Sequence, residues 1–137
     1  MNQLKRSIVP FLVIMVITFL LIDFGDRPMK YELVSYQDVP EDLKNSVLLD
    51  LGPGGGGLHQ VNRYTYAFIG TEPDEKAIIE FVGDAHDGIG KEVRYSVSQS
   101  KPGEEATIIK GRFGDYAVHI VRIEKRISEP FGFFRVN

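Results

Sequence analysis

Cysteine is absent from this chain of 137 residues, and its absence excludes several kinds of chemistry at once. Without a thiol the protein has no disulfide, no thiolate metal ligand and no cysteine nucleophile. It also lacks the lipid-accepting cysteine of a bacterial lipoprotein signal. Cysteine usage therefore indicates no particular redox compartment for the protein.

Long runs of basic residues are absent as well. Residues 28–137 carry 13 basic and 17 acidic side chains, a net charge of −4, with the two signs interspersed. A nucleic-acid-binding surface needs basic residues gathered on one face, so the composition predicts no nucleic-acid partner. These 110 residues suffice for one modest hydrophobic core and leave no room for a second domain.

One long apolar run is present, near the N-terminus. Ser7 to Ile22 contains no charge, follows Lys5 and Arg6, and is closed by Asp23 and Asp26. As a helix these 16 residues reach about 24 Å, slightly less than the ~30 Å hydrocarbon core, a mismatch that snorkelling and local thinning accommodate. Because flanking basic residues stay in the cytoplasm, the run predicts a single-pass anchor with the domain outside.

Two other interpretations of this run are open. A cleaved secretory signal needs small residues three and one positions before the cut, and Leu21 to Asp26 offers no such pair. We therefore prefer an uncleaved anchor, with secretion after cleavage as the alternative. A helix that is apolar on every side can also be the buried core of a soluble protein, but it needs a larger protein around it than this chain provides.

Beyond the anchor, the hydrophobic pattern predicts a mainly β domain of the α+β class with one short helix. Pro40 and the acidic residues around it favour a helix start, and Leu43, Val47 and Leu48 fall on one face, so this helix should end near Leu49. Short turn-rich connections favour an antiparallel meander of five or six strands, because parallel pairing needs long crossovers. The expected strands are Tyr31–Tyr36, Tyr64–Ile69, Ala77–Val82, Glu92–Ser98, Ala106–Lys110 and Tyr116–Ile123.

A glycine-rich segment, 52–57, separates the helix from the strands that follow. Its five glycines cannot continue a helix, and they predict a mobile loop. A phosphate-binding P-loop would end in Gly-Lys-Ser/Thr, whereas Leu58-His59-Gln60 follows here. The segment is therefore interpreted as a flexible connector.

The densest group of polar functional side chains lies in Gly83-Asp84-Ala85-His86-Asp87-Gly88. Asp84, His86 and Asp87 place two carboxylates and an imidazole within four residues, which makes them candidate metal ligands or acid/base groups. A complete metal site would need further ligands from elsewhere, and Asp and Gly are also typical of a turn between strands. The turn is the preferred interpretation, and no cofactor is predicted.

No catalytic constellation stands out elsewhere. His119 alternates with Ala117 and Val121 in an apolar strand, which is typical of a packed or edge histidine. The serines of segment 96–100 have no base at a recognisable spacing, and triads are identified by geometry and not by sequence order. No catalytic residue is predicted, and an enzyme is the less favoured class.

The last eight residues are unusually aromatic for a chain end. Phe131, Phe133 and Phe134 lie within four positions of each other. They either fold back to close the core, which we prefer, or offer an apolar patch or edge strand to a partner. They are the candidate partner-binding residues.

One stretch carries motifs of a known kind. The motifs are Ile69-Gly70-Thr71-Glu72-Pro73 after a strand, Val93–Val97, Lys101-Pro102-Gly103 and Tyr116–Val121. With them, residues 66–123 resemble the small β domain of bacterial protease-complex-associated, protease-inhibitor-like envelope proteins, and the resemblance covers under half of the chain. Members tend to carry Gly-Gly-Tyr after the proline, where this chain has Asp74-Glu75-Lys76. The resemblance implies protein binding without catalysis.

These observations define one expected architecture. Residues 1–27 form a cytoplasmic stub and membrane anchor, and residues 28–137 form an extracytoplasmic β-rich domain. The predicted function is a non-catalytic protein-interaction module of the bacterial envelope. The alternative is a tethered enzyme or metal-binding domain centred on the loop with Asp84, His86 and Asp87.

Overall fold

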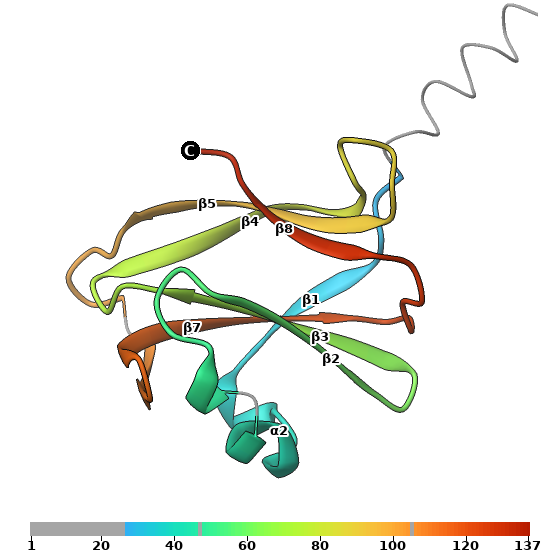
Figure 1. Cartoon of the computed structure of the whole chain (residues 1–137). Coiled ribbons are helices and arrows are strands. Elements are labelled where there is room, and N and C mark those ends of the chain that lie inside the picture. The colour runs from blue at the N-terminus through green and yellow to red at the C-terminus, as the bar shows by residue number, and fades with distance from the viewer. Residues whose placement is uncertain (1–26, 47, 105) are drawn as a thin grey trace, which may run out of the picture.

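Apolar residues alternate with a period of two along most of the domain, and this pattern favours β-strands. The computed structural model describes residues 27–137 apart from 47 and 105, and eight strands lie among them (Figure 1). The strands are β1 Tyr31–Val34, β2 Gly56–Val61, β3 Tyr64–Thr71, β4 Glu75–Asp84, β5 Lys91–Gln99, β6 Thr107–Gly111, β7 Gly114–Ile123 and β8 Phe131–Arg135. One α-helix, α2 Glu41–Ser46, lies between two 3-10 turns, η2 Tyr36–Asp38 and η3 Leu48–Asp50.

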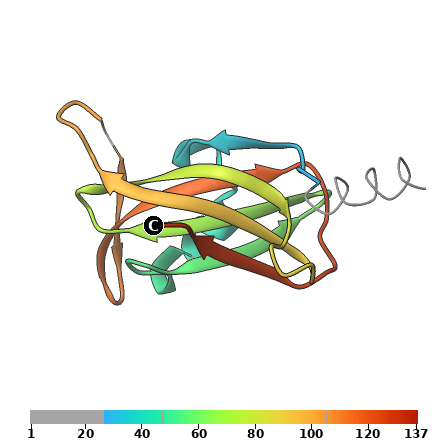
Figure 2. The same ribbon diagram turned by 90° about the horizontal axis from the view of Figure 1, so that it is seen from above.

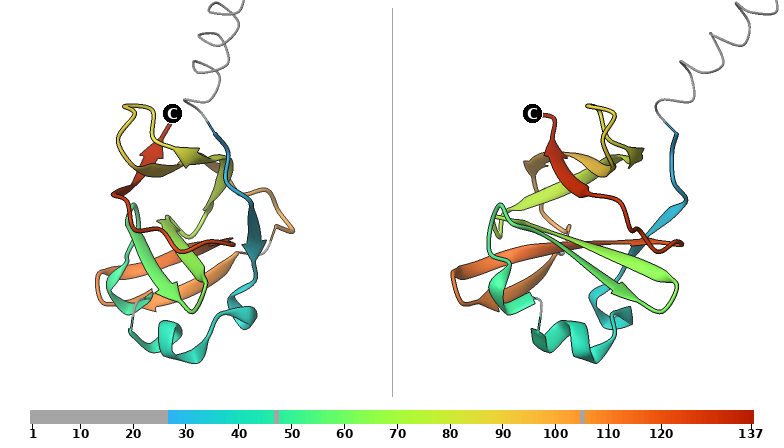
Figure 3. Two further views of the ribbon diagram at one scale, coloured as in Figure 1. Left: turned by 90° about the vertical axis from the view of Figure 1, so that its right-hand side faces the viewer. Right: turned by 45° about the vertical axis from the view of Figure 1, so that its right-hand side comes forward.

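The strands form two sheets. The large sheet has the order β1-β7-β3-β2, with β6 also pairing with β7, and all its pairs are antiparallel. The small sheet has the order β4-β5-β8, in which β4 is antiparallel and β8 parallel to β5. The chain crosses from one sheet to the other after β3, after β5 and after β7. The two sheets stack as layers (Figure 3).

The prediction of a mainly β, mostly antiparallel domain with one short helix is confirmed. Two details differ. The described residues contain eight strands and not five or six, because β2 begins inside the glycine-rich segment and β8 comes from the aromatic tail. The topology is also not a simple meander, because β7 pairs with β1 and β3, which lie far from it in sequence.

The inner faces of the two sheets share one hydrophobic core. Ala67, Ile69 and Val121 of the large sheet meet Val82 and Val93 of the small sheet, and all five are at most 1% exposed. Removing each such side chain from water contributes about 25 cal/mol per Å² of apolar surface. This shared core holds the two layers together.

The outer face of the large sheet is covered by the helical segment. Leu43 and Leu48, each 1% exposed, pack against Phe68 and Tyr116, which are fully buried. Leu43 and Leu48 both pack against this sheet, but α2 ends at Ser46, before the predicted Leu49, so Leu48 lies in η3 and not on the face of one helix. Val47, predicted on the same face, lies outside the described residues. Figure 3 shows this segment beneath the large sheet, on the side away from the small sheet.

The outer face of the small sheet has no such cover. Seen from above, no described helix or strand lies over β4, β5 and β8 (Figure 2). Ile78, Phe134 and Val136 remain 46%, 39% and 42% exposed there. The same molecule therefore has one covered and one uncovered sheet.

The glycine-rich segment is paired with β3 along part of its length, which differs from the predicted mobile connector. The amide of Gly54 donates to the carbonyl of Gly70 at 2.9 Å, and the amide of Gly70 donates to the carbonyl of Gly55 at 2.9 Å. A side chain at position 70 would begin 2.1 Å from the carbonyl oxygen of Gly52. Glycine is needed here because two backbones approach closely.

The predicted anchor from Ser7 to Ile22 lies outside the described residues. Among residues 27–137, with positions 47 and 105 excepted, no helix has the length and apolar character to cross a bilayer. The anchor therefore stays a prediction from the sequence.

Candidate functional site

The structure brings the two candidate segments of the sequence together. Parallel pairing of β8 with β5 sets Phe131 beside Lys91, at the base of the turn that carries His86. The imidazole of His86 then lies 4.4 Å from the ring of Phe134, measured between centroids. A groove of about 310 Å³ lies between the turn and the tail.

The three candidate ligands of the turn face different partners. The carboxylate of Asp84 pairs with the ammonium group of Lys91, which lowers the Asp84 pKa, and it also accepts a weak bond from the Arg27 amide at 3.4 Å. Asp87 accepts the Ile89 amide at 2.9 Å, which closes the turn. Nowhere in the described part of the chain do three potential ligands gather around one point.

His86 is held by a carboxylate that the sequence did not single out. Glu92 is 3% exposed, and its Oε1 accepts the His86 backbone amide at 3.0 Å and contacts Nδ1 of the imidazole at 2.7 Å. Its Oε2 accepts a bond from Nε of Arg94 at 2.5 Å. Burial raises the Glu92 pKa, but the bonds from His86 and Arg94 outweigh burial and leave that pKa below its usual value.

This polar network lies on the outer face of the small sheet, between two aromatic rings. The Arg94 guanidinium stacks over Phe81 with 4.4 Å to the ring centroid, and it donates to the Asp84 carbonyl at 3.1 Å. Phe134 lies on the other side, next to His86. Each charged group of this network has an opposite charge or a dipole beside it. The network therefore holds the His86 turn and the Arg94 side chain in one arrangement.

Acid–base groups meet in this groove. A buried carboxylate that orients an imidazole through Nδ1 is an arrangement found in general bases. Among the described residues of the lining, His86, Asp87 and Glu92 are of the kinds that act as bases or nucleophiles, and Lys91 is paired with Asp84. The arrangement holds the turn in place and presents its aromatic neighbours.

The aromatic tail is divided between core and surface. Phe131 and Phe133 pack against the shared core, and their rings meet edge to face at 5.6 Å. Phe134 points to the opposite face and is 39% exposed. The tail is fastened beyond β8, where the Asn137 side chain donates to the Val97 carbonyl at 2.7 Å and accepts its amide at 3.0 Å.

β8 leaves one backbone edge open. Lys91 donates to the Pro130 carbonyl and Val136 donates to the Tyr95 carbonyl, so the even-numbered residues of the tail face β5. The amides and carbonyls of Phe131, Phe133 and Arg135 therefore point the other way. No described strand pairs with that edge.

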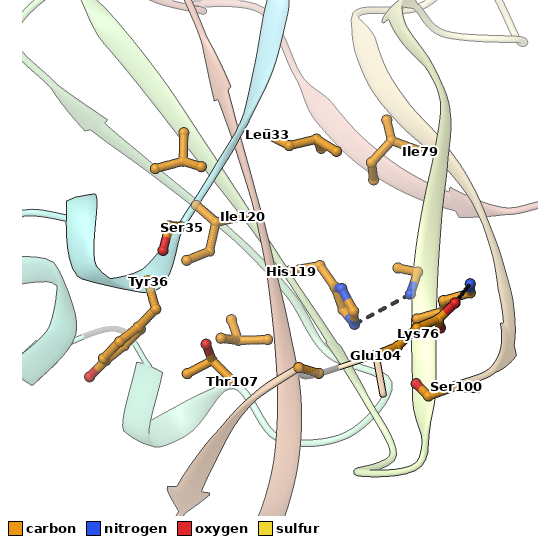
Figure 4. Close-up of a pocket in the computed structure, with 14 residues that line it drawn as sticks. Leu33, Ser35, Tyr36, Lys76, Ile79, Ser100, Glu104, Thr107, His119 and Ile120 are labelled. Carbon is orange, nitrogen blue, oxygen red and sulfur yellow. Dashed lines mark hydrogen bonds and ion pairs between the residues drawn. The ribbon is translucent and has the colours of Figure 1, made fainter. Parts of the chain in front are cut away.

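A second groove, of about 440 Å³, lies between the ends of β1 and β6 (Figure 4). His119 reaches from β7 across it, and Nε2 accepts the Ala77 amide of β4 at 3.3 Å and lies 3.0 Å from the Thr71 hydroxyl. Burial lowers the His119 pKa. The neutral imidazole thus links the two sheets by hydrogen bonds, which explains why a polar residue lies in this apolar strand.

We compared the chain with known protein families, proteins and structures. No protein-family model, curated protein or solved structure matches the chain. The resemblance of residues 66–123 to the β domain of protease-complex-associated envelope proteins therefore stays a prediction from its motifs.

Proposed function

We propose that this protein is a membrane-anchored, extracytoplasmic module of the bacterial envelope that binds a protein partner and performs no catalysis. The observation that carries the proposal is the open edge of β8 beside the uncovered outer face of the small sheet. The apolar run Ser7 to Ile22 supports the anchor. The motif resemblance, which implies protein binding, points in the same direction.

The open edge favours partner binding through added strand pairing. Proteins usually guard a sheet edge with charges, prolines or bulges, because unpaired amides and carbonyls bind any extended chain. β8 contains three phenylalanines, one glycine and a single charged residue, Arg135. A partner segment in extended conformation can continue the small sheet along this edge.

Side chains beside the edge offer specificity for that segment. Gly132 lies on the outer face next to Phe134, and no atom lies within 4 Å of where its Cβ would be. An apolar side chain of the added strand fits this open position and contacts the exposed Phe134 ring. Aromatic anchors of this kind contribute much of the energy of protein interfaces.

Photo-crosslinking tests the proposed surface directly. Because the chain has no cysteine, Phe134→Cys carries a single benzophenone probe, and Ile108→Cys on β6 is a matched control at 44% exposure against 39% for Phe134. In membranes of the native cell, we expect a discrete protein adduct from position 134 and none from position 108. Equal adducts at both positions, or adducts at 108 alone, would contradict the proposal.

A tethered enzyme or metal binder centred on Asp84, His86 and Asp87 is the second candidate. It is favoured by one observation, the orientation of the His86 imidazole by Glu92. A metal at 100 times its dissociation constant would stabilise the protein by about 2.7 kcal/mol. We expect calcium and zinc to leave the melting temperature of the full chain unchanged, and a shift that disappears in His86→Ala would favour this candidate.

A further inference from the structure

The strand registers define two ends of the domain. One end, called the anchor end, consists of residues 27–30, 62–63, 85–90 and 124–130. These segments are joined by hydrogen bonds: Asp84 donates its amide to the Arg27 carbonyl at 3.2 Å, and Glu124 donates its amide to the Lys30 carbonyl at 3.3 Å. The opposite end consists of the described residues of the segments 35–55, 72–74, 100–106 and 112–113, which leaves out positions 47 and 105.

The sequence before Arg27 limits how far the anchor end can lie from a bilayer. Four residues lie between Ile22, the end of the apolar run, and Arg27, the first described residue, so five residue-to-residue steps connect them. A fully extended chain spans at most about 3.6 Å per residue, so this connection reaches roughly 18 Å. If the run spans the hydrocarbon core, Arg27 lies within that distance of the core boundary, which keeps the anchor end within reach of the headgroups.

Charge is distributed unequally between the two ends. The connections at the anchor end carry five basic and three acidic side chains, whereas those at the opposite end, apart from residue 105, carry three basic and seven acidic ones. The basic ones at the anchor end are Arg27, Lys30, Arg63, Lys125 and Arg126. An anionic surface attracts the first end and repels the second.

The anchor end also presents an apolar side chain and a basic recess. Ile89, at the tip of the turn between β4 and β5, is 69% exposed. A recess of about 370 Å³ beside Arg27 is lined by Lys30, Lys91 and Lys125. Lys30 pairs with Glu124, the one acidic residue of the lining, and Lys91 pairs with Asp84. An exposed isoleucine beside lysines fits the boundary between acyl chains and phosphate groups.

We propose that the anchor end lies against the bilayer, with Ile89 inserted among the headgroups of anionic lipids and Lys125 of the recess beside their phosphates. This inference rests on the proposed function, because it requires Ser7 to Ile22 to be the anchor. It fixes the orientation of the domain, since β8 then runs away from the membrane surface with its open edge exposed to the envelope.

The experiment uses the full chain in proteoliposomes whose lipids carry brominated acyl chains. A small fluorophore is attached to Ile89→Cys, or to Phe113→Cys at the opposite end, where the native side chain is 70% exposed against 69% for Ile89. We expect the lipids to quench the probe at 89 several-fold more than the probe at 113. Quenching at 89 should be stronger with phosphatidylglycerol than with phosphatidylcholine and weaker in high salt.

Charge variants in the same vesicles provide the matched control. Lys125→Glu, at the anchor end, should reduce quenching at position 89, and Lys110→Glu, on β6, should leave it unchanged. Vesicles that float with the chain but quench both probes alike, or neither, overturn the orientation and leave the anchor intact. A chain that does not float with the vesicles overturns the anchor and the orientation together.

Discussion

The two sheets share one core but differ in what covers their outer faces. On the large sheet, the helical segment buries Phe68 and Tyr116 completely. On the small sheet, Ile78 and Phe134 remain 46% and 39% exposed, and no described helix or strand lies over it (Figure 2). The one helical segment among the described residues thus covers the large sheet and leaves the outer face of the small sheet uncovered.

Two buried polar groups show how differently the faces are built. The Tyr116 hydroxyl donates to the Leu48 carbonyl beneath the helical cover, and burial raises its pKa to about 12. Glu92 is equally inaccessible on the other face, but the His86 turn and Arg94 cover it, and their bonds lower its pKa. Apolar packing encloses the buried polar group of the large sheet, whereas a local network of charges encloses that of the small sheet.

Removal of the tail should have the largest effect on stability. Truncation after Glu129 deletes β8 and with it Phe131 and Phe133, and burial of such rings contributes roughly 1.5–3 kcal/mol each when complete. Domains have about 5–15 kcal/mol in total, so we expect no cooperative melting transition in the truncated chain. A transition within a few degrees of that of the full-length chain would show that the tail belongs to an interface alone.

The difference between the two outer faces predicts unequal losses of stability when similar side chains are shortened to alanine. Leu43→Ala removes a fully covered side chain and should lower the free energy of unfolding by about 2–5 kcal/mol. Ile78→Ala removes a half-exposed one and should lower it by less than about 1 kcal/mol. Urea denaturation measures both, and equal losses would mean that the small sheet is also covered in solution.

Glu92→Gln tests the charge network. At neutral pH the variant should lose about 1–3 kcal/mol, because the bonds from His86 and Arg94 lose their charged acceptor. In the native protein the Glu92 pKa lies below its unfolded value near 4.5, so its contribution is present above that pH and disappears as pH falls through the folded pKa. The pH dependence of stability below pH 5 should therefore be flatter in Glu92→Gln. If stability falls in the same way below pH 5 in both proteins, the Glu92 carboxylate does not contribute this stability.

The smallest expected effect on stability concerns His119, whose hydrogen bonds link the two sheets. The His119 pKa lies below its unfolded value of 6.5, so the neutral ring contributes stability above that pH and loses it as pH falls through the folded pKa. His119→Gln keeps a polar group but does not titrate, and the decline in stability just below pH 6.5 should be weaker in this variant. Thermal melting at a series of pH values measures the difference, and an unchanged decline would place its origin elsewhere.

Local patterns in the sequence predict part of the difference between the two sheets. The alternation in Tyr116–Ile123 and the apolar spacing of Leu43 and Leu48 identify the large sheet and its cover. The turn at 85–90 is also recognisable from its Asp and Gly residues. Glu92 could have been connected with His86, because the hairpin brings residues six positions apart together across the turn.

Other features depend on pairing between distant segments. The parallel pairing of β8 with β5 joins positions about 40 apart, and no local signal indicates it. The start of β2 at Gly56 was missed because glycine carries no side-chain pattern, and only its contact with β3 makes it a strand. The division of the tail between core and surface follows from that unpredicted pairing.

Arg135 tests the central claim, that β8 accepts a partner strand at its open edge, most directly. Arg135→Pro removes an amide that points away from β5, so the small sheet should keep its hydrogen bonds, and Arg135→Ala controls for loss of the side chain. Both are made in the Phe134→Cys crosslinking background. We predict that the adduct from position 134 is lost in Arg135→Pro and kept in Arg135→Ala, while both variants melt within a few degrees of each other. An adduct that persists undiminished in Arg135→Pro would contradict strand addition at β8.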